Sequence, residues 1–326
     1  MATIEDVVKK SGVSRSTVFR FLNGSNVRAD AKKAIIQAME ELNYKTELIY
    51  KHHNISIDVS IAKNFEGFQG FTEIVQGITQ RADEKGIRIN LVRHTGDQIL
   101  QDYERWNTEK ELKGVIVIGK NKEDEKLEME MLRSKKIPHI FVNRVFEERD
   151  ISYVAVDLKQ AAYDIVNYLI QKGHQKIAVI GKPDRLKVDE DKMEGYREAF
   201  HKNDIKVSDE YFCSVQDSKE WEKKIHEILS SKELPTAYFG ICDSHAIKFM
   251  HIAESYGYKV PEDIAVVGMD DVEIAAYSKP TLTTIHIPFQ KMGILAVDQL
   301  VQLIMDEEIC CTKTIVGHTL IERSSS

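Results

Sequence analysis

From Ile55 onward, short runs of β-branched and apolar residues alternate with amphipathic segments, and this alternation constrains the fold most. Buried strands are predicted at 57–62, 87–92, 114–119, 139–143, 176–181, 237–242 and 263–271. Amphipathic helices are predicted between them at 73–85, 98–107, 158–172, 192–202 and 244–256. Chains of this kind build parallel sheets that helices cover on both faces.

The length of this region predicts more than one sheet. About 270 residues follow position 54, and a single hydrophobic core stops growing at about that size. The predicted fold class is therefore α/β, with two doubly wound parallel-sheet lobes that face each other.

The first 44 residues have a different pattern, that of three short helices. Thr3 can cap a helix over 4–11, and Gly12 ends it. Ser14 can then cap a second helix, whose apolar residues recur at helical spacing, and a third helix is predicted at about 30–42. Two helices joined by a glycine-containing turn are typical of the helix-turn-helix motif.

Charge is divided unevenly between these regions. The whole chain has a formal net charge of -7, yet residues 1–53 hold nine Lys and Arg against six Asp and Glu, which leaves 36 against 46 for the remainder. A small basic head is thus attached to an acidic body. Only the head has the charge that favours a nucleic-acid partner.

The segment 12–24 is the strongest local signal, because its residue types suit DNA. Hydroxyl groups at Ser14 and Thr17 can reach phosphates. Arg15, Ser16 and Arg20 lie on the first turns of a helix that could enter the major groove, where arginine can bond guanine in a bidentate pair. The alternative is a small helical bundle with solvated arginines.

Several ordered motifs resemble one family. The head reads TIEDVVKKSGVSRSTVFRFLNG, close to the pattern TIxDVAxxAGVSxxTVSRVLNG. The body has GH before KIAVIG, then EGYREA, PTA before a strand, VPEDI before VVGMDD, and LTTI before the closing LIERSSS. In these motifs the chain resembles the LacI/GalR-type transcriptional regulators over almost its whole length.

This resemblance implies both an architecture and a function. It implies a helix-turn-helix head at 1–44, a hinge linker at 45–54 and a periplasmic-binding-protein-like core at 55–326. The first lobe would hold about 55–155 and 286–315, and the second about 156–285 and 316–326. Such a protein is a homodimer on a double-stranded DNA operator, most often a repressor, and is controlled allosterically by a small effector such as a sugar or phosphosugar.

The resemblance also assigns DNA-binding residues. They are Thr3, Ser14, Arg15, Ser16, Thr17, Arg20 and Asn23 in the head, with Lys51 and His53 in the hinge. The hinge departs from the family, since His53 stands where the family has a leucine that inserts into the minor groove. Weak bending of the DNA is therefore expected.

A second set of residues is expected to bind the effector between the lobes. Lys192 and Cys242 replace the family's pocket arginine and asparagine, while Asp270 is retained. A carboxylate at 270 can accept hydroxyl hydrogen bonds from a sugar, and Lys192 could neutralise an anionic group. The alternative is that Asp270 caps a turn and Lys192 is solvated. Phe71, Arg144 and Asp243 complete the predicted set.

Other classes of protein find little support in the sequence. The near P-loop at 114–120 lacks the hydroxyl residue that should follow its lysine, and no HExxH, GxSxG or GxGxxG occurs. We expect no enzyme activity, cofactor or metal. The four cysteines form no CxxC pair, and no targeting or membrane-spanning segment is recognised, so a cytoplasmic protein without membrane attachment is expected.

The sequence leaves two alternative functions open and supports one further structural expectation. A cytosolic solute-binding protein with a vestigial head is one alternative function. A DNA-binding regulator controlled by a protein partner, in place of a small molecule, is another. The segment 288–306 is also predicted to present surplus apolar surface to a two-fold interface, the alternative being that its apolar side chains all lie in the lobe core: Met292, Leu295, Ala296, Leu300, Leu303 and Ile304.

Overall fold

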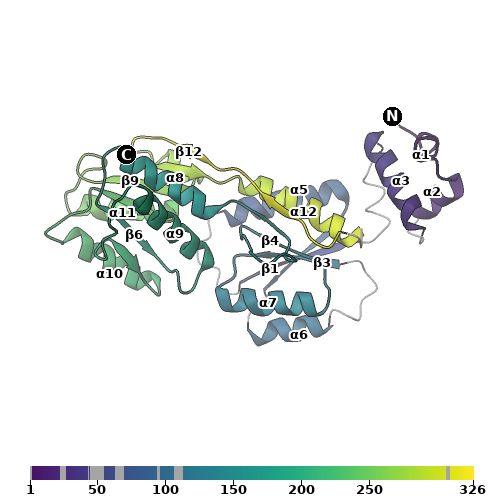
Figure 1. The fold of residues 1–326 in the computed structure, drawn as a ribbon, viewed down its shortest axis with the longest axis horizontal. Coiled ribbons are helices and arrows are strands. Elements are labelled where there is room, and N and C mark those ends of the chain that lie inside the picture. The colour runs from purple at the N-terminus through teal and green to yellow at the C-terminus, as the bar shows by residue number, and fades with distance from the viewer. Residues whose placement is uncertain are drawn as a thin grey trace.

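The chain folds into a three-helix head and two sheet-based lobes (Figure 1). This computed structural model describes residues 2–22, 27–42, 44, 55–62, 70–93, 96–105, 113–305 and 309–326. The predicted fold class is confirmed, with one antiparallel strand pair as an exception.

The head consists of α1 (Ile4–Ser11), α2 (Arg15–Leu22) and α3 (Ala29–Glu41). A complete capping box starts α1, because the Thr3 hydroxyl accepts from the backbone of Asp6 and the Asp6 carboxylate accepts from the backbone of Thr3. Gly12 ends α1 with φ of 66°, a left-handed conformation that glycine adopts without steric cost. The head core is formed by buried apolar side chains of all three helices: Val7, Val18, Phe21, Leu22, Ile35, Ala38 and Met39.

The first lobe is built on a six-stranded, wholly parallel sheet. Its strand order is β11-β5-β4-β3-β1-β2. The strands are β1 (Ser56–Ile61), β2 (Arg88–Arg93), β3 (Lys113–Ile118), β4 (His139–Val142), β5 (Tyr153–Ala155) and β11 (Lys313–Ile315). Two pairs of helices lie on opposite faces of this sheet in Figure 1: α5 (Phe71–Lys85) with α12 (Phe289–Met305), and α6 (Asp97–Arg105) with α7 (Lys122–Ser134).

The second lobe has a sheet of the same size, in the order β12-β10-β9-β8-β6-β7. Its strands are β6 (Ile177–Gly181), β7 (Phe212–Ser214), β8 (Ala237–Gly240), β9 (Ala265–Asp270), β10 (Thr283–His286) and β12 (Thr319–Ile321), the last of which runs antiparallel to β10. The helices are α8 (Leu158–Gln171), α9 (Lys187–Lys202), α10 (Ser218–Leu229), α11 (Asp243–Ser255) and the short η2 (Glu273–Ala276). Alternate residues of β6 face different helices, since Ile177 and Val179 share a core with α8 and α9 while Ala178 and Ile180 share one with α10 and α11.

The chain passes between the lobes three times. The passages lie after β5, after β10, and between β11 and β12. Each lobe is therefore built from segments that are distant in sequence, and the passages are the covalent links about which the lobes can move.

Helix α12 packs against the first lobe with most of its apolar side chains. Met292, Ala296 and Leu300 are fully buried. A Cβ at Gly293 would lie 2.2 Å from the carbonyl oxygen of Ile74, so α12 crosses α5 at very short range. Leu295, Leu303 and Ile304 are only partly buried but also pack against the core. Lobe core thus accounts for most of this helix, and its predicted share in a two-fold interface stays a prediction.

Candidate DNA interface and effector site

Helix α2 has one buried and one exposed face. Val18, Phe21 and Leu22 are at most 6% exposed and fasten the helix to the head core. Arg15, Ser16 and Arg20 are exposed on the other side. The three side chains that the sequence predicts to read bases are thus presented together on the exposed face of α2.

Hydroxyl groups order the start of α2. The Ser14 hydroxyl lies 2.8 Å from that of Thr17 and 3.1 Å from that of Ser16, and it accepts from the backbone N–H of Thr17. This is the predicted N-cap. Arg15 is held by an exposed ion pair with Glu5 of α1, at 3.0 Å, a contact weak enough to exchange for a phosphate or a base edge.

Three predicted DNA-binding residues, Asn23, Lys51 and His53, lie outside the described residues. The prediction for the hinge therefore stays a prediction. Thr3 is exposed, with its hydroxyl engaged by Asp6.

In the second lobe, Lys192 and Asp270 are brought together near the carboxyl ends of the strands. Ligands of open parallel sheets bind at this edge. Lys192 comes from α9 and is 7% exposed, and its ammonium donates a 2.7 Å hydrogen bond to the carbonyl of Ile241, which follows β8. The proposal that Lys192 is merely a solvated helix residue does not fit this burial.

Asp270, the last residue of β9, is 6% exposed and has φ of 126°. Such a backbone conformation costs free energy and is typical of functional sites. Burial raises the pKa of Asp270 well above its usual range, and the carboxylates of Asp243 and Glu73 raise it further, while Lys192 opposes the rise. The nearby positive charge of Lys192 thus does not offset the effects of burial and of the neighbouring carboxylates on this group.

Asp243 has a different environment from Asp270. It is fully buried at the start of α11, where one carboxylate oxygen accepts from the Thr284 hydroxyl at 2.5 Å and the other from the Val272 backbone at 2.9 Å. Burial raises its pKa to about 6, against the lowering effect of these hydrogen bonds. These contacts join α11 to the segments around β9 and β10. Effector binding by Asp243 stays a prediction.

Cys242 and Phe71 complete the predicted lining. Cys242 precedes α11, and its sulfur lies 3.2 Å from the Ser244 hydroxyl; burial raises the pKa of the thiol, so it is neutral. Phe71 is the first residue of α5 and is half-buried.

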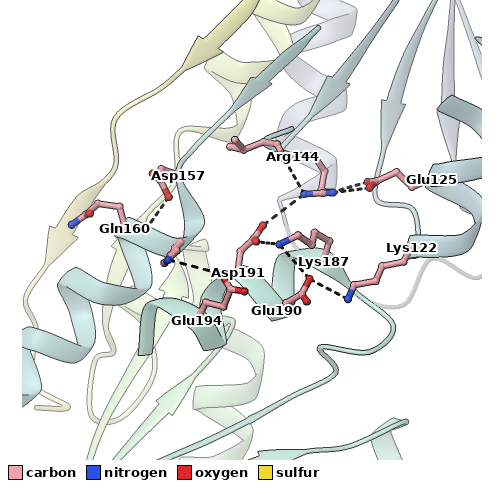
Figure 2. A network of polar contacts seen from close by, with 11 residues as sticks. Lys122, Glu125, Arg144, Asp157, Gln160, Lys187, Glu190, Asp191 and Glu194 are labelled. Carbon is pink, nitrogen blue, oxygen red and sulfur yellow. Dashed lines mark hydrogen bonds and ion pairs between the residues drawn. The ribbon is translucent and has the colours of Figure 1, made fainter. Parts of the chain in front are cut away.

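Arg144, expected to bind the effector, is occupied by carboxylates. Its guanidinium forms two 2.7 Å hydrogen bonds with Glu125 of the same lobe and lies 3.7 Å from Asp191 of the second lobe (Figure 2). Its side chain is only 11% exposed. In this arrangement Arg144 joins the lobes, and its predicted contact with an effector stays untested.

Two polar residues near this site were missed by the sequence analysis. Glu73 of α5 has a pKa that is raised by burial and by Asp271 and lowered by His286, which places it close to the end of β9. His245 of α11 packs against Trp221 with the two ring centroids 4.6 Å apart and the rings tilted by 31°, and burial lowers its pKa to about 4, so it is neutral at pH 7. Both residues lie in the first turn of a helix that follows a strand, and this position could have indicated from the sequence that they are near the site.

Comparisons with known proteins agree with this geometry. Residues 3–47 match the family model for bacterial regulatory proteins of the lacI family, and residues 166–326 match a periplasmic binding protein-like domain. The chain is 30% identical, over 100% of its own length and 98% of the relative's, to the probable HTH-type transcriptional repressor ExuR of Bacillus subtilis (strain 168). This chain belongs to the lacI family.

Further lacI-family proteins resemble it in sequence or in fold. The HTH-type transcriptional repressor PurR of Vibrio atlanticus (strain LGP32) is 29% identical, over 94% of this chain and 93% of the relative. A complex of the transcriptional regulator CelR with cellobiose has a TM-score of 0.75 at 24% identity and covers 100% of both chains. The lac repressor dimer bound to operator and the anti-inducer ONPF has a TM-score of 0.72 at 24% identity, over 99% of this chain and 98% of that one.

Membership of the lacI family confirms the prediction of a DNA-binding transcriptional regulator. The relatives are named as repressors, which agrees with the expectation of a protein that is not an enzyme. In the part of the chain that the structure describes, no cluster of metal-ligating side chains occurs. None of the described helices is long and apolar enough to cross a membrane.

Proposed function

We propose that this lacI-family protein is a transcriptional repressor whose affinity for its operator is changed by a carbohydrate-like effector bound between the two lobes. The observation that carries the effector proposal is that Asp270 and Lys192 are both buried, and are close enough for Lys192 to oppose the rise in the pKa of Asp270. Such a pair suits a ligand that offers both hydroxyl donors and an acceptor or anionic group.

The cellobiose complex of CelR supports this class of ligand by analogy. Hydroxyl groups of a sugar would donate to Asp270, and such hydrogen bonds would favour the ionised form of a carboxyl group whose pKa burial raises. Lys192 would then face a ring oxygen, a hydroxyl or the anionic group of a phosphosugar. The predicted lining by Phe71 supplies an apolar face of the kind that sugar rings pack against.

We further propose that the chain acts as a homodimer. Strand β2 lies at the edge of its sheet, where Leu91 is 54% exposed; in the second lobe, Ile274 of η2 is 53% exposed and Tyr277, just after η2, is 70% exposed. Exposed apolar side chains on an edge strand and on a short protruding helix favour burial in an interface. A dimer would place two heads on two half-sites. A repressor of this kind acts on DNA in the cytoplasm, so the proposal places the chain there.

Selection of bound sequences from random double-stranded DNA tests these proposals together. The full chain is expected to enrich one sequence with two inverted half-sites whose centres lie about 10 base pairs, or a multiple of that, apart. A single unrepeated half-site would contradict the dimer. Failure to enrich any sequence would contradict site-specific binding and favour a solute-binding protein with a vestigial head.

A further inference from the structure

Six charged side chains of alternating sign form a continuous network between the lobes (Figure 2). The first lobe supplies Lys122 and Glu125 from α7 and Arg144 from the segment after β4. The second lobe supplies the others, all from the first two turns of α9: Lys187, Glu190 and Asp191. Three cations and three anions cancel, so the network has no net charge to be compensated by a ligand.

Two ion pairs of this network cross between the lobes. Lys122 lies 3.1 Å from Glu190, and Arg144 lies 3.7 Å from Asp191. Within each lobe, Glu125 holds Arg144 in a bidentate pair, and Lys187 contacts both Glu190 and Asp191. Arg144, Glu190 and Asp191 are therefore each positioned by a partner of their own lobe, which lowers the entropic cost of forming the crossing pairs.

Because these ion pairs are partly buried, solvent screens their attraction less than it screens that of isolated surface pairs. The side chains of Arg144 and Asp191 are 11% and 19% exposed, while Lys122 and Glu190 are each 34% exposed. A backbone contact accompanies them, since the N–H of Lys122 donates to the carbonyl of Arg185 at 3.1 Å. Lys122 is the first residue of α7, and an N–H at that position has no acceptor within its own helix.

We propose that this network is an ionic latch that holds the lobes in the observed arrangement, with Arg144 as a positioning residue of the latch. Separation of the lobes must break both crossing ion pairs and release the N–H of Lys122. The latch contributes to the free energy of lobe closure, so it determines how much of that free energy an effector has to supply. It also makes lobe closure dependent on ionic strength. The latch itself does not depend on which effector binds, or on whether one does.

Hydrogen exchange of the Lys122 amide in the full-length protein, without ligand or DNA, tests this proposal. The Glu190→Lys variant places like charges opposite Lys122, and exchange of the Lys122 amide is expected to become about 3- to 10-fold faster. Glu194→Lys is the matched control, because it makes the same charge change one turn further along α9, where Glu194 pairs with Lys159 of its own lobe. The control is expected to leave this amide unchanged.

The amide of Glu125 serves as an internal reference, since it bonds to the carbonyl of Asn121 at the start of the same helix. Raising the salt concentration from 0.05 to about 0.5 M should speed exchange at Lys122 and leave Glu125 unchanged. Asp191→Asn removes only the charge that faces Arg144, and it is expected to act in the same direction if Glu190→Lys does not fold. Equal exchange in the latch and control variants, or a parallel increase at Lys122 and Glu125, would overturn the latch.

Discussion

Replacing Asp270 by asparagine is expected to weaken binding of a carbohydrate effector by about 10- to 100-fold. Asparagine keeps one acceptor oxygen in place of two and cannot take up the negative charge that hydroxyl donors of a ligand would favour, and a hydrogen bond to a charged group contributes about 1.5–3 kcal/mol. Asparagine is the suitable replacement because Asp270 has φ of 126°, a conformation that strains alanine. The variant therefore tests the carboxylate and not the backbone.

Binding can be followed by the rise in melting temperature with glucose and with glucose 6-phosphate, and then by calorimetry with the more effective compound. Asp209→Asn is a matched control, since Asp209 is exposed in the turn before β7. An undiminished rise in the Asp270→Asn variant would place the effector elsewhere. If no hexose or hexose phosphate raises the melting temperature of the unmodified chain, control by a protein partner becomes the better account.

The second large effect is expected on stability. Asp243→Ala should lower the free energy of unfolding by about 2–4 kcal/mol, because it leaves the Thr284 hydroxyl and the Val272 N–H buried without their acceptor. Asp243→Asn keeps an acceptor for Val272 and a group that can bond Thr284. Its cost at pH 7 is expected to stay within about 1 kcal/mol, since the neutral amide avoids burial of a charge.

The carboxyl group of Asp243 also makes the free energy of unfolding depend on pH, and its raised pKa determines the direction of that dependence. Its pKa is raised from 3.8 to about 6 in the folded protein, so the folded state holds the proton over that range and the unfolded state does not. The contribution of Asp243 to stability therefore falls as pH rises from about 4 to 6 and is constant above that. Urea unfolding at pH 4, 5, 6 and 7 should show that Asp243→Asn loses this part of the pH dependence. Equal stability losses in the alanine and asparagine variants would contradict the account.

The strands of this fold, and the helices that carry the family motifs, can be predicted from the local sequence. The strand β6 was predicted at 176–181 and lies at Ile177–Gly181, because a fully apolar run between polar segments has few alternatives. Helix α9 was predicted to start at Lys192 but starts at Lys187. Its first turn is rich in lysine and acidic residues and has no apolar period. The same reason explains why α7, largely charged, was not predicted.

The candidate site likewise contains residues that the sequence could locate and contacts that it could not. Lys192 and Asp270 could be located from their motifs, because each motif fixes a position at the carboxyl edge of a sheet. The contacts of Arg144 could not, since Glu125 is 19 residues away and Asp191 lies on the other lobe. Contacts between the lobes depend on how the two lobes pack against each other, and no local periodicity of the sequence predicts that packing.

The most direct test of DNA-specific regulation compares Arg20→Ala with the unmodified chain on the selected operator and on random DNA, by anisotropy at one fixed salt concentration. Arg20 is exposed on the face of α2 opposite Val18 and Phe21, so its loss should spare the fold. The account predicts a loss of about 1–3 kcal/mol on the operator and a much smaller loss on random DNA. Lys9→Ala, which removes a charge from α1, should lower both affinities equally. Equal losses on both DNAs for Arg20→Ala would contradict base reading by this helix.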